Sequence, residues 1–130
     1  MEVSQALADL TELSSQIRTA VVLDAAGALR GSTVNPEQSD PLVQAAGKLI
    51  AAARALRSGD EVTRVEVELG EGAVFVLREG AWTIAATTGP QPTSGLVAYD
   101  LRTCLHALDE PEKPARRRTR KAKSEEAETA

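Results

Sequence analysis

Apolar residues recur every three or four positions along three segments of the chain, which predicts three helices. The first helix carries the stripe Val3, Leu7, Leu10, Leu13 and Ile17. After a polar loop over residues 35–39, a second helix is expected to begin with Asp40 as N-cap and Pro41 as first helical residue, and to stop at Ser58-Gly59. The last helix, capped by Thr93 or Ser94, carries the stripe Val97, Leu101, Cys104, Leu105 and Leu108.

Five shorter segments have the pattern of strands. Residues 20–23 are wholly apolar, and the turn Asp24-Ala25-Ala26-Gly27 leads into a weaker strand over 28–33. Residues 62–69 alternate between apolar and charged side chains, whereas 73–77 and 82–86 are continuous apolar runs. Hairpin turns are predicted at Gly70-Glu71-Gly72 and Arg78-Glu79-Gly80.

The pattern of apolar and charged residues along these strands, which we call strand texture, predicts their order in a sheet. A strand covered on both faces is continuously apolar, and a partly exposed strand alternates. Numbered along the chain, strands 1, 4 and 5 are continuous, so strands 1 and 5 should meet in the middle. We therefore predict an α+β fold, an α/β sandwich of topology αββαβββα, with a five-stranded antiparallel sheet of order 2-1-5-4-3. The second helix should cover one face, and the first and last helices the other.

Composition and charge divide the chain into a domain and a tail. The chain has 130 residues, of which 42% are hydrophobic, enough to fill one core. Residues 1–108 carry 8 basic and 13 acidic residues, a net charge of −5, while residues 109–130 carry 7 basic and 6 acidic residues, a net charge of +1. Because this second segment lacks Leu, Ile, Val and aromatic residues, it is expected to be a disordered tail.

The composition also limits the chemistry. Cys104 and His106, the single cysteine and histidine, cannot make an ordinary four-ligand zinc site or an internal disulfide. The sequence contains neither of the two glycine-rich nucleotide-binding motifs, G-x-x-x-x-G-K-[ST] and G-x-G-x-x-G. We expect no catalytic residue, cofactor or metal, and we do not expect an enzyme. No basic leader precedes an apolar segment and no apolar run approaches the ~20 residues of a membrane helix, so a cytoplasmic protein without a membrane span is expected.

This layout resembles the roadblock (dynein light chain) family, particularly its compact bacterial members. The resemblance covers about residues 3–108 and is carried by the hairpin Ala20-Val21-Val22-Leu23-Asp24-Ala25-Ala26-Gly27, the helix start Asp40-Pro41-Leu42, the turns at Gly70, Gly72 and Gly80, and the apolar helix from Leu96. It implies a homodimer whose third strands pair into a ten-stranded sheet, with the second helices packed together. It also implies a role in binding or regulating small Ras-like GTPases, as activator or scaffold.

Two features of the residues themselves favour a dimer. At 100° per residue, the second helix is apolar over roughly half its circumference, and a sheet would occupy only the centre of that arc. The predicted edge strand 62–69 has no Pro or Gly to discourage pairing. Alternatively, alanine is simply a good helix former and the edge is solvated. The residues expected at the dimer interface are Val62, Arg64, Val65, Glu66, Glu68, Val43, Ile50 and Ala52.

Charge predicts the register of this pairing. If two copies pair antiparallel about Val65, Arg64 faces Glu66 of its partner twice over. Pairing about Glu66 instead would place two like charges opposite each other. Each exposed ion pair contributes only ~0.2–1 kcal/mol, so the pairs select register more than they add affinity.

The remaining candidates are single residues and the tail. We expect His106 on the surface, Cys104 in the core and Asp24 in a turn, and Trp82 either in the core or as a partner anchor. Arg30, Arg54, Arg57 and Arg78 are candidate arginine fingers that no spacing distinguishes. Residues 113–123 hold seven basic residues and no acid, so the tail either solubilises the chain or binds a polyanion without sequence specificity. The polyanion-binding residues would be Arg116, Arg117, Arg118, Arg120, Lys121 and Lys123.

The function expected from these features is a homodimeric module that binds a small Ras-like GTPase and regulates it. The alternative is an adaptor that binds nucleic acid or another anionic surface through its basic tail.

Overall fold

The computed structural model describes residues 1–56, 59 and 61–109. These residues form three helices and five strands in the predicted order along the chain. Their bounds are α1 (Val3–Leu13), β1 (Ile17–Leu23), β2 (Leu29–Ser32), α2 (Pro36–Leu56), β3 (Arg64–Leu69), β4 (Gly72–Glu79), β5 (Trp82–Thr88) and α3 (Ser94–Asp109).

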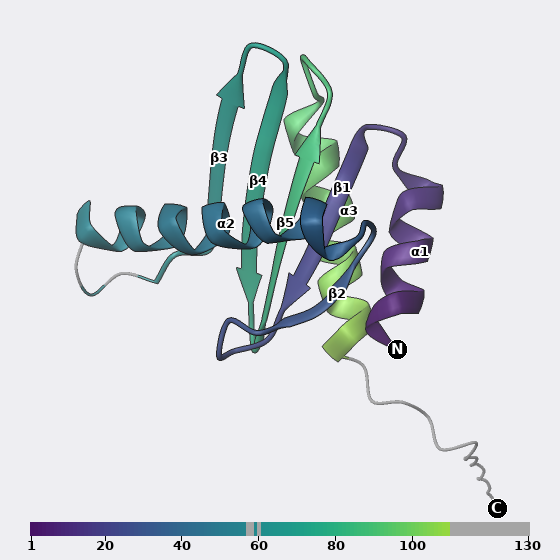
Figure 1. Ribbon diagram of the computed structural model, residues 1–130, viewed down its shortest axis with the longest axis horizontal. Coiled ribbons are helices and arrows are strands. Elements are labelled where there is room, and N and C mark those ends of the chain that lie inside the picture. Colours follow the sequence, from purple (N-terminus) through teal and green to yellow (C-terminus); the bar gives the residue numbers. More distant parts are fainter. Residues whose placement is uncertain (57–58, 60, 110–130) are drawn as a thin grey trace, which may run out of the picture.

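The strands form one antiparallel sheet of order β2-β1-β5-β4-β3, which confirms the prediction made from strand texture. In Figure 1, α2 crosses one face of the sheet, whereas α1 and α3 cover the other. No helix within the described residues is long and apolar enough to cross a membrane.

Each face of the sheet has its own hydrophobic core. The larger core lies under α1 and α3, and its most buried side chains are Phe75, Ile84, Leu101 and Leu105. The smaller core lies under α2 and contains Leu42, Ala46, Val21, Val76 and Ala85. Because neighbouring residues of a strand point to opposite faces, Val21 and Val22 of β1 enter different cores, and both are fully buried.

The structure corrects the extent of the first helix. The expected stripe continued to Ile17, but α1 ends at Leu13, and the Ser14 N–H bonds to the Leu10 carbonyl at 2.9 Å. Ile17 instead begins β1, pairs with Thr88 and is buried. Leu13 is 76% exposed. The part of the apolar stripe that packs in the core is therefore shorter than the stripe predicted from the spacing of apolar residues.

The second helix also begins earlier than expected. Its N-cap is Asn35, whose side-chain oxygen accepts the Gln38 N–H at 3.0 Å, and Pro36 occupies the first position. Residues 36–39 are therefore helical, the loop prediction for them is wrong, and Pro41 lies inside the helix. Asn35-Pro36 and Asp40-Pro41 have the same capping chemistry. The earlier start adds a turn that buries Ser39 on the same side as Leu42 and Ala46.

Smaller shifts occur at the strand ends. β3 begins at Arg64 instead of Val62, and β2 covers four residues. Arg78 and Glu79 belong to β4 and pair with Thr83 and Trp82, so the last hairpin turn is Gly80-Ala81. The turn at Asp24 is confirmed, because its carboxylate accepts the N–H groups of Ala26 and Ala28.

We predict that Gly72→Ala destabilises the fold. A Cβ atom at Gly72 would overlap the carbonyl oxygen of Thr88, which is backbone and cannot easily yield. The expected loss in the free energy of unfolding is about 1–3 kcal/mol, measured by urea denaturation. Gly70→Ala is the control, because a Cβ there meets nothing within 4 Å. Equal stability of the two variants would contradict this packing.

We also predict that Cys104 reacts slowly in the folded chain. Burial, with a smaller effect of the Asp9 charge, raises the pKa of the Cys104 thiol from 9.0 to about 11. Only the thiolate is nucleophilic, so alkylation by iodoacetamide at pH 8 should be roughly a hundredfold slower than for an ordinary thiol. Unfolding in urea should restore the ordinary rate. A fast native reaction would show that α1 does not pack over this residue of α3.

Candidate interaction surface

β3 has a sheet partner on one side only. It occupies the edge of the sheet beside β4, and no other described strand pairs with it. The Arg78 N–H bonds to the Thr63 carbonyl at 3.0 Å, which fixes which residues face β4. Since hydrogen-bonded and non-bonded pairs alternate in an antiparallel ladder, Arg64, Glu66 and Glu68 direct their backbone N–H and C=O groups outward. This row of unpaired groups is available to another strand.

The side chains of β3 divide between the two faces of the sheet. Val65 and Val67 are half-buried on the α2 face, opposite Val76 and Val74 of β4. Glu66 faces the other side, where its carboxylate accepts a hydrogen bond from Ser94 Oγ at 2.5 Å. It also forms an ion pair with Arg64 of the same strand at 3.6 Å.

The charges predicted to meet across a dimer thus already meet within one chain. The hydrogen bond from the first residue of α3 to Glu66 was not foreseen, because nothing in the sequence places Ser94 beside β3. Val62, the first residue of the predicted interface, precedes β3 and is half-buried.

α2 extends beyond the sheet at β3. Figure 1 shows its C-terminal turns passing the edge strand, and Leu56 at its end is 82% exposed. The three interface residues predicted on this helix do not share one flank. Val43 and Ile50 are half-buried against the smaller core on one flank, and Ala52 is exposed on the opposite flank. A single neighbouring helix can therefore contact only one of these two groups.

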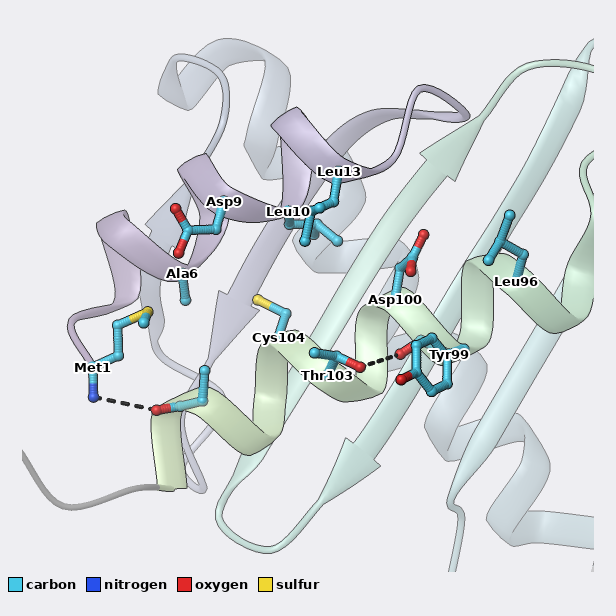
Figure 2. Close-up of a pocket in the computed structure, with 11 residues that line it drawn as sticks. Met1, Ala6, Asp9, Leu10, Leu13, Leu96, Tyr99, Asp100, Thr103 and Cys104 are labelled. Carbon is cyan, nitrogen blue, oxygen red and sulfur yellow. Dashed lines mark hydrogen bonds between the residues drawn. The ribbon is translucent and has the colours of Figure 1, made fainter.

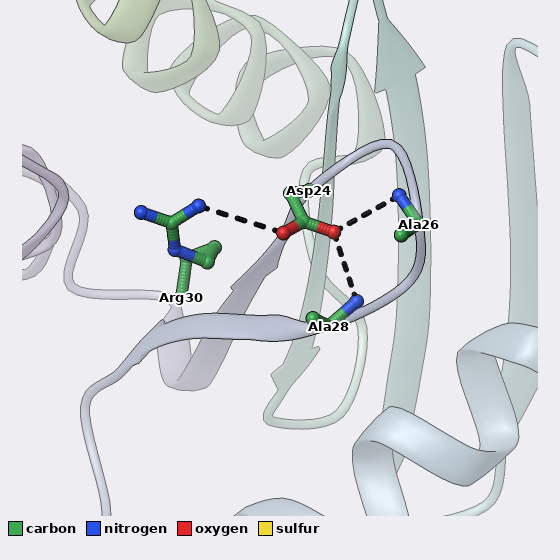
Figure 3. A network of polar contacts seen from close by, with 4 residues as sticks. All are labelled: Asp24, Ala26, Ala28 and Arg30. Atoms are coloured by element: carbon green, nitrogen blue, oxygen red, sulfur yellow. Dashed lines mark hydrogen bonds and ion pairs between the residues drawn. The ribbon is translucent and has the colours of Figure 1, made fainter.

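The structure separates the four candidate arginines. Arg30 pairs with Asp24 at 3.5 Å, and Figure 3 shows the Asp24 carboxylate between this guanidinium and the N–H groups of Ala26 and Ala28. The Ala28 N–H is the main cause that lowers the pKa of Asp24, with Ala26 and Arg30 contributing further. Arg57 lies outside the described residues. Arg54 and Arg78 come together at one hollow of about 280 Å³ beside the Asp24 turn.

A second, larger hollow of about 500 Å³ lies on the opposite face of the molecule, between α1 and α3. Figure 2 shows side chains from both helices around it. Leu13, Leu96 and Tyr99 line it and are 76%, 49% and 64% exposed, and Asp9 and Asp100 supply negative charge. Its exposed apolar residues were not singled out in the sequence, because Leu13 was assigned to a buried stripe.

The other single residues take up structural positions. His106 is exposed and contacts the Glu79 carboxylate, which also pairs with Arg102 at 3.6 Å. Trp82 is half-buried against the larger core. Among the described residues, no group of three or more His, Cys, Asp or Glu side chains could hold a metal ion. The basic residues of the tail lie outside the described part of the chain.

Comparisons with known proteins identify the fold. No family model and no curated protein matches the sequence. Among solved structures, the chain is similar to a roadblock/LC7 domain from Streptomyces avermitilis, with 19% identity and a TM-score of 0.73 over 83% of this chain and 95% of that one. It is also similar to MglB from Myxococcus xanthus, with 16% identity and a TM-score of 0.66 over 82% of this chain and 90% of that one.

The same fold occurs in a third setting. LokiProfilin2, in a complex with rabbit actin, is 15% identical with a TM-score of 0.58 over 80% of this chain and 92% of that one. The higher structural similarity is to the roadblock/LC7 domain. The chain therefore has the fold of the roadblock/LC7 domains, as its sequence resemblance implied.

Proposed function

We propose that the chain is a cytoplasmic, non-enzymatic member of the roadblock family that forms a homodimer and binds a small Ras-like GTPase, whose nucleotide state it regulates. The observation that carries the proposal is the bare edge of β3 beneath the overhanging end of α2, on a roadblock fold. Both features would be covered together by a second copy of the chain. Two sheets joined at β3 would then form a continuous platform.

The geometry favours one flank of α2 for the contact with a second helix. Ala45 and Ala52 lie on the flank that carries the exposed Leu56, and their small side chains permit close approach of two helices. The opposite flank, with Val43 and Ile50, is partly occupied by contacts with the smaller core and the Asp24 turn. We therefore assign the helix–helix contact to the flank of Ala52. Val43 and Ile50 then face the hollow beside the Asp24 turn.

Regulation follows from selective binding. A partner shifts a conformational equilibrium only by binding one state more tightly than another. A two-fold platform would hold the switch loops of a GTPase in one conformation, and would act as scaffold or activator according to which conformation it prefers. The α2 face and the β2 side of the sheet are the surfaces to test for this contact.

The basic tail supports a second candidate function. Seven basic residues within 113–123 would let an adaptor bind nucleic acid or another polyanion, with the folded domain serving for dimerisation. The two candidates differ in which part of the chain makes the contact.

We predict that a charge exchange on β3 controls the dimer. In the Val65-centred register, Arg64→Glu or Glu66→Arg alone replaces two attractions by two repulsions, so the dimer should weaken roughly two- to thirtyfold. The double variant Arg64→Glu/Glu66→Arg should recover most of the wild-type affinity. Sedimentation equilibrium measures all three. In the Glu66-centred register the double variant would gain nothing, and a wild-type chain that remains monomeric at high concentration would refute the dimer.

We further predict that removing residues 110–130 separates the two functions. GTPase binding should survive the deletion, whereas binding to duplex DNA should disappear. For the full chain, seven neutralised phosphates correspond to a log–log salt slope of about −6. Pull-down with candidate GTPases in both nucleotide states and DNA titrations at several salt concentrations give the two readouts. Loss of GTPase binding together with the tail would place the GTPase contact on the tail instead of the domain.

A further inference from the structure

Two arginines without an ion-pair partner face the same hollow. The arginine hollow, as we call it, lies between α2 and the turn over residues 24–27, with Arg54 contributed by α2 and Arg78 by β4. Within the described part of the chain, neither guanidinium forms a hydrogen bond or ion pair. Their positive charge is therefore available to a ligand.

The floor of the hollow contains a buried polar side chain. Thr83, at the start of β5, faces α2 beside Leu23 and is only 6% exposed. Its hydroxyl has no hydrogen-bond partner among the described residues. Among the described residues, Ser14 Oγ is the one fully buried side-chain N or O atom without a hydrogen-bond partner, so the Thr83 hydroxyl keeps access to solvent and can donate to a ligand in the hollow.

The space in the hollow depends on a glycine. Gly47 lies on the same flank of α2 as Val43, Ile50 and Arg54, and a Cβ atom there would meet nothing within 4 Å. Glycine is an unfavourable residue inside a helix, and alanine at this position would stabilise the helix. A larger residue at this position would fill the hollow without removing either arginine.

The charge balance of the hollow selects the type of ligand. Arg54 and Arg78 contribute two positive charges, and Asp24, which also lines the hollow, contributes one negative charge. The Asp24 carboxylate is already held by two backbone N–H groups and Arg30, so it does not neutralise the other arginines. Arg54 and Arg78 therefore keep their charge for an anion, and the Asp24 carboxylate beside them repels a doubly charged phosphate more strongly than a singly charged carboxylate. Guanidinium groups also bind carboxylates through paired N–H donors.

We propose that the arginine hollow binds one carboxylate, supplied by an acidic side chain of the protein docked on the α2 face. Arg54 and Arg78 donate to the carboxylate oxygens, and Thr83 donates its hydroxyl. The source of the carboxylate rests on the proposed function, since that function brings a protein to this face. The hollow itself lies within one copy of the chain, so its affinity for a carboxylate requires neither a dimer nor a GTPase.

Titration of the full chain with acetate tests the site directly. In ¹⁵N-resolved NMR spectra, sodium acetate should produce saturable shifts at Gly47, Arg78 and Thr83, which sodium chloride at equal ionic strength does not produce. Arg54→Gln and Arg78→Gln should each weaken acetate binding roughly fivefold or more. Arg18→Gln is the matched control, because Arg18 lies at a different hollow beside Gly89 and Pro92, and it should bind as the wild type does.

Two further variants separate binding from folding. Gly47→Leu should abolish acetate binding while the free energy of unfolding stays equal or rises, because leucine favours the helix. Thr83→Val keeps the shape of the side chain and should weaken binding without destabilising the fold. Unaltered acetate binding in both arginine variants and in Gly47→Leu would overturn the site. NMR shifts that grow linearly and equally in acetate and chloride would also overturn it, because they would show that the two arginines are solvated and bind no specific anion.

Inorganic phosphate distinguishes the ligand class. At pH 7.5 it should bind more weakly than acetate, and tighter binding of phosphate would overturn the assignment to a carboxylate. Failure here and failure of the proposed function give different results. A chain that dimerises and binds a GTPase but ignores acetate lacks only this site. A chain that binds acetate but no GTPase retains the site and loses the proposed function.

Discussion

Burial of both faces of the central strands is the constraint on which the rest of the structure depends. β1, β5 and β4 place apolar residues in both cores, so helices must cover the sheet from both sides. The two edges are then treated differently. β2 is short, has an irregular register with β1, and brings Gly31 against Val3 of α1. β3 is longer and regular, and α2 crosses one of its faces. Short and irregular strands discourage pairing, so β3 is the edge open to another chain.

The arrangement of the sheet followed from the sequence because two-sided burial leaves a direct signature in the residues. Runs such as Ala20-Val21-Val22-Leu23 have no polar face to turn toward water. Element boundaries were less accessible. Leu13 and Ile17 have helical spacing, but only the folded chain decides that one is exposed and the other paired in β1. Two Asx-Pro pairs offered the same helix start, and the burial of Ser39 on the sheet distinguishes them.

The candidate site was less predictable than the fold, because it depends on side chains brought together from distant segments. Arg54 and Arg78 have no shared motif, and only the crossing of α2 over the sheet places them at one hollow. Helical periodicity indicated that α2 is apolar over roughly half its circumference, but it could not show that Val43 faces this hollow. Ser94 meets Glu66 for a similar reason, since the start of α3 lies over β3. Local sequence patterns carry no signal for such contacts.

The hydrogen bond between Arg78 and Thr63 has a consequence for anything that docks on β3. The outward-facing backbone groups of β3 are spaced two residues apart, about 6.6–6.8 Å, because every intervening residue directs its amide toward β4. An incoming strand cannot slide by one position without losing its whole ladder. A shift in register is therefore a step of two residues, and each step changes which of Arg64, Glu66 and Glu68 the incoming strand contacts. Recognition at this edge therefore selects among a small number of discrete registers.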